Sequence, residues 1–286
     1  MPNHVFTSPD SRARYLQAYD AAMREWPIPY EELDVTTDFG LTHGVISGPA
    51  DAPGLLLVPG NFASLTTWQY NIEALSHDYR VFAIDTIDDL GKSCPTRFPG
   101  NRSDYAAWLR QTIRGLELDS ASVIGHSYGG ALALNLALAE PALVDKLALL
   151  APGVPFAPPK AAWMWGAPMI LRPSPWTVRL FFKHASVKGF ASDDPRLNQM
   201  IVGIPGLHSR IPRRPVFAAE EYAGLRVPTL LLIGDHEIMY DAHRAVSRAY
   251  ELCPGLKADI VADAGHTLHL DQADAVNGKL LAFLSA

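Results

Sequence analysis

The sequence reads Ala121-Ser122-Val123-Ile124-Gly125-His126-Ser127-Tyr128-Gly129-Gly130 at the point that decides the fold. The residues before Gly125 form an apolar run typical of a buried strand, and the alanine- and leucine-rich stretch that follows, up to 139, is typical of a helix. Glycines on both sides of Ser127 let a strand and a helix meet without a collision between side chains. The stretch therefore predicts a sharp strand-to-helix turn with Ser127 at its corner.

Strand-like and helix-like segments alternate on both sides of this turn. Such alternation predicts an α/β fold with a mostly parallel, doubly wound sheet that helices cover on both faces. The expected strands are 33–37, 43–47, 54–58, 80–84, 120–125, 146–150, 229–233 and 257–262. The expected helices are 10–25, 66–77, 102–117, 128–139, 241–251 and 271–284.

The alternation breaks over residues 152–222, which are rich in proline and aromatic residues. We therefore expect three parts: an N-terminal helical extension over 1–30, a core of 31–151 and 223–286, and an inserted helical cap over 152–222. Apolar side chains of the cap can line a pocket, although most are expected simply to pack the cap itself. They are Phe156, Trp163, Met164, Trp165, Met169, Trp176, Phe181, Phe182, Phe190 and Met200.

Composition limits the class of protein. A chain of 286 residues that is 48% hydrophobic can bury one large core. The net charge is -6 and no long basic block is present, so a nucleic-acid partner is not expected. The two distant cysteines have no metal-site or disulfide spacing, and we expect neither metal nor cofactor. No secretory signal and no membrane span are evident, which predicts a cytoplasmic protein. A monomer and a homodimer are both compatible with the sequence.

The general base for a Ser127 nucleophile is expected later in the chain. Ala264-Gly265-His266 follows the strand 257–262, at the edge of the sheet where α/β folds place active groups. We predict that His266 accepts the Ser127 proton, with His269 as the alternative. His126 should point away from the serine oxygen, because it is adjacent to Ser127 on the sharp turn.

The acid that orients the histidine is expected after the strand 229–233. Asp235 and Glu237 both follow this strand, and either could accept a hydrogen bond from the ring N–H of His266. Asp241 looks like the cap of the next helix instead.

The negative oxygen of an acyl-transfer intermediate needs two backbone N–H donors. Tyr128, directly after the nucleophile, should supply one of them. The other should lie after the strand 54–58. We predict the N–H of Asn61, with Phe62 as the alternative.

Together these motifs resemble the α/β-hydrolase superfamily, and within it the small bacterial carboxylesterases. The similar segments extend over nearly the whole chain: 14–20, 59–61, 85–93, 104–109, 125–130, 234–241 and 264–266. The superfamily's acid usually stands three residues after the glycine that ends its strand, so the resemblance implies Glu237 rather than Asp235. Pro59 stands where a histidine is usual, which removes a side-chain hydrogen bond that could brace the oxyanion loop.

The resemblance implies acyl transfer to water. Dehalogenases and epoxide hydrolases of this fold carry aspartate at the position of Ser127, so they are excluded. We therefore predict a serine esterase that cleaves a carboxylic ester of a small, largely hydrophobic substrate through an acyl-enzyme on Ser127. A biosynthetic lactonase, cyclase or acyltransferase is the alternative, because the fold does not fix the acyl acceptor. A non-catalytic small-molecule receptor is disfavoured by the intact serine, histidine and acid.

Overall fold

The computed structural model describes residues 5–153, 156–158, 160, 166–208 and 215–286. Within these residues the strands form one nine-stranded sheet in the order β1-β2-β4-β3-β6-β7-β8-β9, with β5 paired to β2. The strands are β1 Glu31–Thr37, β2 Gly40–Ser47, β3 Gly54–Val58, β4 Arg80–Ile84, β5 Cys94–Pro95, β6 Ala121–His126, β7 Val144–Leu150, β8 Thr229–Gly234 and β9 Lys257–Val261. The α-helices are α1 Pro9–Met23, α2 Ile72–Leu75, α3 Arg102–Gly115, α4 Tyr128–Ala139, α5 Ala167–Leu171, α6 Pro175–Ala185, α7 Pro195–Gly203, α8 Ala242–Leu252, α9 Leu268–Asp271 and α10 Ala273–Leu284.

The sheet is mostly parallel, as predicted. Every adjacent pair from β4 through to β9 is parallel, whereas β2 runs antiparallel to β1, β4 and β5. Strand β3 has β4 on one side and β6 on the other, so the chain winds outward from β3 in both directions. In such a sheet, ligand sites form outside the carboxyl ends of the strands near this reversal.

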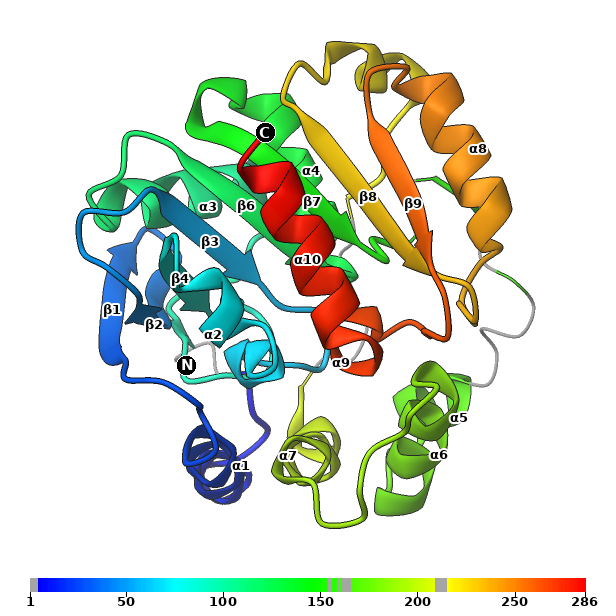
Figure 1. Ribbon diagram of the computed structural model, residues 1–286. Coiled ribbons are helices and arrows are strands. Elements are labelled where there is room, and N and C mark those ends of the chain that lie inside the picture. Colours follow the sequence, from blue (N-terminus) through cyan, green and yellow to red (C-terminus); the bar gives the residue numbers. More distant parts are fainter. Residues whose placement is uncertain (1–4, 154–155, 159, 161–165, 209–214) are drawn as a thin grey trace.

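Helices cover both faces of the sheet. Buried side chains of α2 and α10 pack into one apolar cluster with one face, and those of α3, α4 and α8 pack into a second cluster with the other. Figure 1 shows α2, α9 and α10 in front of the strands, with α3 and α4 behind them. The run 55–58 is completely buried, because β3 is covered on both sides. This explains why the central strands are continuously apolar rather than alternating.

One expected helix is interrupted. The predicted helix 66–77 is instead a 3₁₀ turn, Leu65–Trp68, followed by the four-residue α2. Between them the buried Asn71 side chain donates hydrogen bonds to the His269 carbonyl at 3.2 Å and to Asn277 Oδ1 at 2.8 Å. These tertiary bonds hold the chain in a non-helical path that local propensity does not reveal. The predicted helix 271–284 is confirmed as α10, which begins two residues later, at Ala273, after the short α9.

Helices α5, α6 and α7 lie between β7 and β8 in the chain, within the segment 152–222. Helix α7 packs against α1, and Figure 1 shows both beyond the end of the sheet, with α5 and α6 beside them. Trp163, Met164 and Trp165, which the sequence marked as candidate pocket residues, lie outside the described residues. Across the described ranges, no helix has the length and apolar character that crossing a bilayer requires.

Candidate active site

The register of the sheet brings distant parts of the chain to one edge. Val58 at the end of β3 pairs with Gly125 of β6, and Gly234 at the end of β8 pairs with Val261 of β9. Strand β7 joins these two pairs of strands. The loops after β3, β6, β8 and β9 therefore all begin at the same carboxyl edge, where the sequence placed its candidate residues.

Ser127 stands on a strained turn. Its φ of 49° and ψ of -113° lie outside the regions that non-glycine residues ordinarily adopt. A Cβ on Gly125 would lie 2.4 Å from the carbonyl oxygen of Gly129, and a Cβ on Gly129 would lie 2.3 Å from that of Val58. Only glycine allows this approach of strand and helix. Ser127 N–H donates to the Leu150 carbonyl at 2.8 Å, which fixes the turn to β7.

A chain of hydrogen bonds runs from Ser127 through His266 to Glu237. The Ser127 hydroxyl donates to His266 Nε2 at 2.9 Å, and His266 Nδ1–H donates to Glu237 Oε2 at 2.7 Å. The Glu237 side chain is fully buried, and its other oxygen accepts the Met239 N–H at 2.8 Å. This arrangement leaves the lone pair of Nε2 directed at the serine hydroxyl, which is the geometry of a general base.

The structure separates the two candidate acids. Asp235 Oδ1 accepts a hydrogen bond from the Ala264 N–H at 3.1 Å, and so ties the loop after β8 to the loop after β9. Glu237, not Asp235, contacts the imidazole of His266. Asp241 caps α8, as expected, by accepting the Arg244 N–H at 2.9 Å.

His126 and His269 lie next to His266 but have other environments. The His126 ring donates from Nε2 to the His266 carbonyl at 2.9 Å. The His269 ring packs between His126 and Trp68, with centroid distances of 4.3 and 4.9 Å. Burial lowers the pKa of His269 to about 3 and the pKa of His126 well below its ordinary value, so both stay neutral. Of the three rings, His266 is the one that contacts Ser127.

The candidate oxyanion donors lie on either side of Ser127. Tyr128 begins α4, so its N–H is among the first-turn donors that a helix leaves without an internal acceptor. The Phe62 N–H donates to Asp89 Oδ2 at 2.7 Å. This bond removes Phe62, the alternative of the sequence analysis, from the candidate donors and leaves Asn61.

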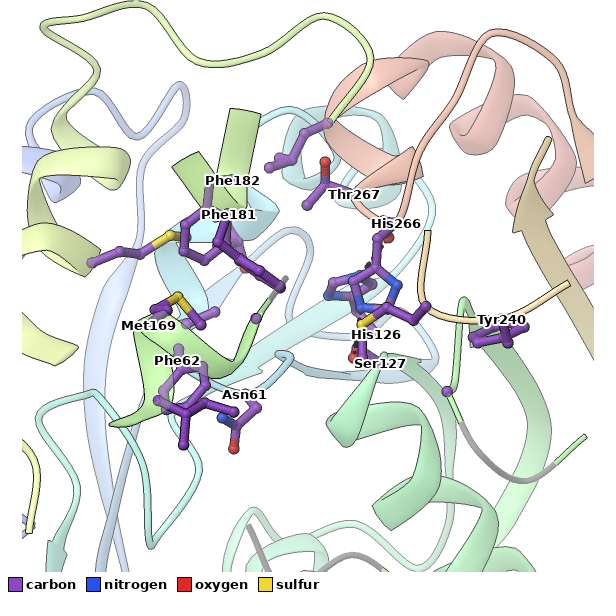
Figure 2. Close-up of a pocket in the computed structure, with 18 of the residues that line it drawn as sticks. Asn61, Phe62, His126, Ser127, Met169, Phe181, Phe182, Tyr240, His266 and Thr267 are labelled. Atoms are coloured by element: carbon purple, nitrogen blue, oxygen red, sulfur yellow. Dashed lines mark hydrogen bonds between the residues drawn. The ribbon is translucent and has the colours of Figure 1, made fainter. Parts of the chain in front are cut away.

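A cavity of about 500 Å³ opens over Ser127 and His266. Its lining is mainly apolar and comes both from the loops at the sheet edge and from the segment 152–222. Figure 2 shows Met169, Phe181 and Phe182 facing Ser127 across the cavity, with Asn61 and Phe62 nearby. Other lining residues include Ala63, Thr67, Met200, Met239, Tyr240, Thr267 and Leu270.

Some of this lining was predicted from the sequence and the rest was not. Met169, Phe181, Phe182 and Met200 line the cavity, whereas Phe156 packs on Tyr222, Phe190 packs on Phe182 and Trp176 is exposed. Met239, Tyr240 and Leu270 were missed. A usable signal existed, because they stand within a few residues of the candidate acid and base. The described residues contain no cluster of three or more histidine, cysteine or acidic side chains arranged to hold a metal ion.

Comparisons with known proteins agree on the family. The model of the alpha/beta hydrolase family matches residues 55–279. Carboxylesterase YbfK of Bacillus subtilis is 35% identical over 291 residues, which cover 98% of this chain and 96% of that protein. The uncharacterized carboxylesterase nap of the same organism is 34% identical over 309 residues, covering 100% and 98%. The crystal structure of naproxen esterase (carboxylesterase NP) from Bacillus subtilis matches with a TM-score of 0.90 at 32% identity, covering 97% of this chain and 99% of that one. The chain therefore belongs to the alpha/beta hydrolase family.

Proposed function

We propose that this protein is a carboxylic ester hydrolase in which Ser127 is the nucleophile, His266 the general base and Glu237 the acid that orients it. The observation that carries the proposal is the hydrogen-bonded chain of these three side chains at the wall of an apolar cavity. Two relatives that match nearly the whole chain are named carboxylesterases, which supports the same chemistry.

The first half of the reaction forms an acyl-enzyme. Ser127 Oγ bonds to the ester carbonyl carbon while its proton passes to His266 Nε2. Glu237 stabilises the resulting imidazolium through the bond to Nδ1–H. The carbonyl oxygen becomes negative and accepts hydrogen bonds from the N–H groups of Tyr128 and Asn61. When the intermediate collapses, the alcohol leaves with the proton held by His266.

The second half repeats these steps with water. Water gives a proton to His266 and attacks the acyl carbon, and Ser127 leaves as its oxygen recovers that proton. Glu237 and the two N–H donors act as before. The products are the carboxylic acid and free enzyme, and no further reactant is needed.

The cavity indicates the kind of ester. Methionine and phenylalanine side chains surround the space next to Ser127, so the acyl or alcohol part in contact with them is hydrophobic and uncharged. Residues 152–222 act as a cap over the carboxyl edge of the core. The cavity of about 500 Å³ suits a small molecule, so the substrate is not a nucleic acid. A relative of known structure is named for esterase activity on naproxen, which is in keeping with a largely apolar substrate.

The test is a series of p-nitrophenyl esters of increasing acyl length, combined with labelling by a fluorophosphonate. Wild-type protein should hydrolyse several of the esters, and mass spectrometry should place the label on Ser127. Product analysis with an added alcohol distinguishes hydrolysis from acyl transfer. A protein that turns over none of the esters and leaves Ser127 unlabelled is not an esterase of this type.

A further inference from the structure

The segment that follows β4, residues 85–93, fixes the loop that carries Asn61. The buried carboxylate of Asp89 accepts two backbone hydrogen bonds, each at 2.7 Å. Its Oδ2 accepts the Phe62 N–H, and its Oδ1 accepts the N–H of Leu90, the next residue in the chain. Four residues earlier, the buried Asp85 accepts the Leu65 N–H at 2.9 Å. Two carboxylates of one segment thus hold the backbone of the loop after β3.

The bond to Asp89 acts on the peptide unit next to the proposed oxyanion donor. Phe62 has a φ of 62°, a left-handed conformation that is strained for a non-glycine residue. The 2.7 Å hydrogen bond from its N–H to Asp89 helps to hold that conformation. The N–H of Phe62 lies in the same rigid plane as the Asn61 carbonyl, so fixing one sets the backbone rotation at Asn61. This restraint limits the directions that the Asn61 N–H can take.

The adjacent residue reaches the other side of the site. Asp88 Oδ2 accepts hydrogen bonds from the hydroxyls of Tyr105 at 2.5 Å and Tyr128 at 3.3 Å. Tyr128 is the second proposed oxyanion donor, through its N–H. Asp88 and Asp89, which are adjacent in the chain, therefore bind residues on opposite sides of the proposed oxyanion site: Asp88 binds Tyr128, and Asp89 binds Phe62.

Burying the Asp89 carboxylate is costly. Burial raises its pKa well above the usual range, and the N–H groups of Leu90 and Phe62 offset this only in part. Costly ionisable groups in protein interiors concentrate at functional sites. Pro59 offers the loop no side-chain hydrogen bond, whereas Asp89 does.

We propose that Asp89 is a positioning residue for ester hydrolysis, which holds the Phe62 N–H so that the Asn61 N–H is directed at the oxyanion. The proposal rests on the esterase function proposed above. It separates Asp89 from a residue that merely stabilises the fold, because a positioning residue affects the transition state more than it affects binding of the ground state.

The experiment compares Asp89→Ala and Asp89→Asn with the matched control Asp241→Ala. Asp241 also accepts a backbone N–H through its carboxylate, but it does so at the start of α8. For each protein we would measure kcat per active site, counted by fluorophosphonate titration, together with KM. The third measurement is the inhibition constant of an aryl trifluoromethyl ketone, which forms a negatively charged tetrahedral adduct with an active serine.

Asp89→Ala should lower kcat per site by about 10- to 100-fold, since deleting an oxyanion donor outright costs about 10²–10³-fold. KM should change less than about threefold, and the ketone should bind more weakly by a factor that parallels the loss in kcat/KM. Asp89→Asn keeps one oxygen acceptor and should lose less than Asp89→Ala. Asp241→Ala should lower Tm and leave kcat per site unchanged.

Unchanged kcat per site and unchanged ketone affinity in Asp89→Asn and Asp89→Ala would overturn the proposal, whatever happens to Tm. If Asp89→Ala does not fold, Asp89→Asn decides alone, and wild-type values in that variant refute it. Failure of the esterase proposal looks different, because wild-type protein would then hydrolyse no ester and Ser127 would not be labelled.

Discussion

The carboxyl edge of the sheet and the wall formed by residues of α5, α6 and α7 enclose the same cavity in different ways. At the edge, directional hydrogen bonds of 2.7 to 2.9 Å fix Ser127, His266 and Glu237. At the wall, Met169, Phe182 and neighbouring side chains offer apolar surface and shape. Catalytic geometry tolerates little displacement, whereas apolar surface is adaptable. We therefore expect the edge to decide whether reaction occurs and the wall to decide which ester reacts.

The largest effect should come from Ser127→Ala. The variant should keep the fold but lack the proposed nucleophile, so kcat should fall by about 10⁴ to 10⁶ for every ester, because members of a catalytic triad act as a unit. Steady-state hydrolysis of a short and a long p-nitrophenyl ester measures this. Ser103→Ala, on the exposed side of α3, is the matched control and should behave as wild type. More than a few per cent residual activity in Ser127→Ala would remove the serine from the mechanism.

The next largest effect distinguishes the two acids of the loop after β8. If Glu237 is the orienting acid, as proposed, Glu237→Gln removes the charge beside the His266 imidazole and permits the wrong tautomer, a change worth about 10⁴ in kcat for a well-studied triad. Asp235→Asn should be milder, because Asp235 accepts the Ala264 N–H and does not contact the imidazole. The measurement is kcat for both purified variants with intact circular dichroism spectra.

The opposite ranking, with Asp235→Asn inactive and Glu237→Gln near wild type, would assign the orienting acid to Asp235. Small and equal decreases in kcat in both variants would mean that catalysis depends on neither carboxylate. Either result would contradict the view that directional bonds at the edge control the reaction.

The same contrast explains what could be predicted from the sequence. Ser127, His266 and Asp235 or Glu237 could be proposed from the sequence because each lies in a short local motif at the end of a strand. Choosing Glu237 needed the family resemblance. The segment that supports the oxyanion loop was matched to the family, but no local pattern showed that Asp89 accepts a bond from Phe62, 27 residues away.

The wall was less predictable for a physical reason. Apolar packing is not directional, so the sequence of 152–222 does not tell which aromatic residue faces the cavity and which packs elsewhere. Phe181 faces the cavity, whereas Phe156 packs on Tyr222. The interrupted helix at 66–77 has a similar cause, since Asn71 is held by bonds to residues about 200 positions later.

The edge should also respond to acid. The pKa of His269 is lowered to about 3 by burial, while an unfolded histidine titrates near about 6.5. Between these values the unfolded chain binds a proton that the folded chain does not, so stability falls as the pH drops below about 6.5 and continues to fall towards about 3. At pH 5 the loss is on the order of 2 kcal/mol, or about 4–8 °C in Tm.

Thermal unfolding followed from pH 7.5 to pH 5 measures this dependence. His269→Gln cannot be protonated and should reduce the decline in Tm without abolishing it, because the buried His126 also has a lowered pKa. The exposed control His77→Gln should leave the decline unchanged. A slope in His269→Gln equal to that of wild type would show that burial of this ring does not govern the response to acid.

The smallest effects are expected at the wall, where shortening a side chain should change preference rather than the reaction itself. Met200 lines the cavity from α7, and Met200→Ala removes apolar volume without touching Ser127, His266 or Glu237. An added space of one or two methylene groups changes discrimination by about 1–3 kcal/mol at most. We therefore expect the kcat/KM ratio of a long to a short p-nitrophenyl ester to rise by about 3- to 10-fold, while kcat for the short ester stays within about threefold of wild type.

The control is Leu171→Ala. Leu171 also lines the cavity but is mostly exposed to solvent, so its substitution should change the ratio less than Met200→Ala does. A uniform loss for all esters in Met200→Ala would mean that the wall, like the edge, positions the reacting groups.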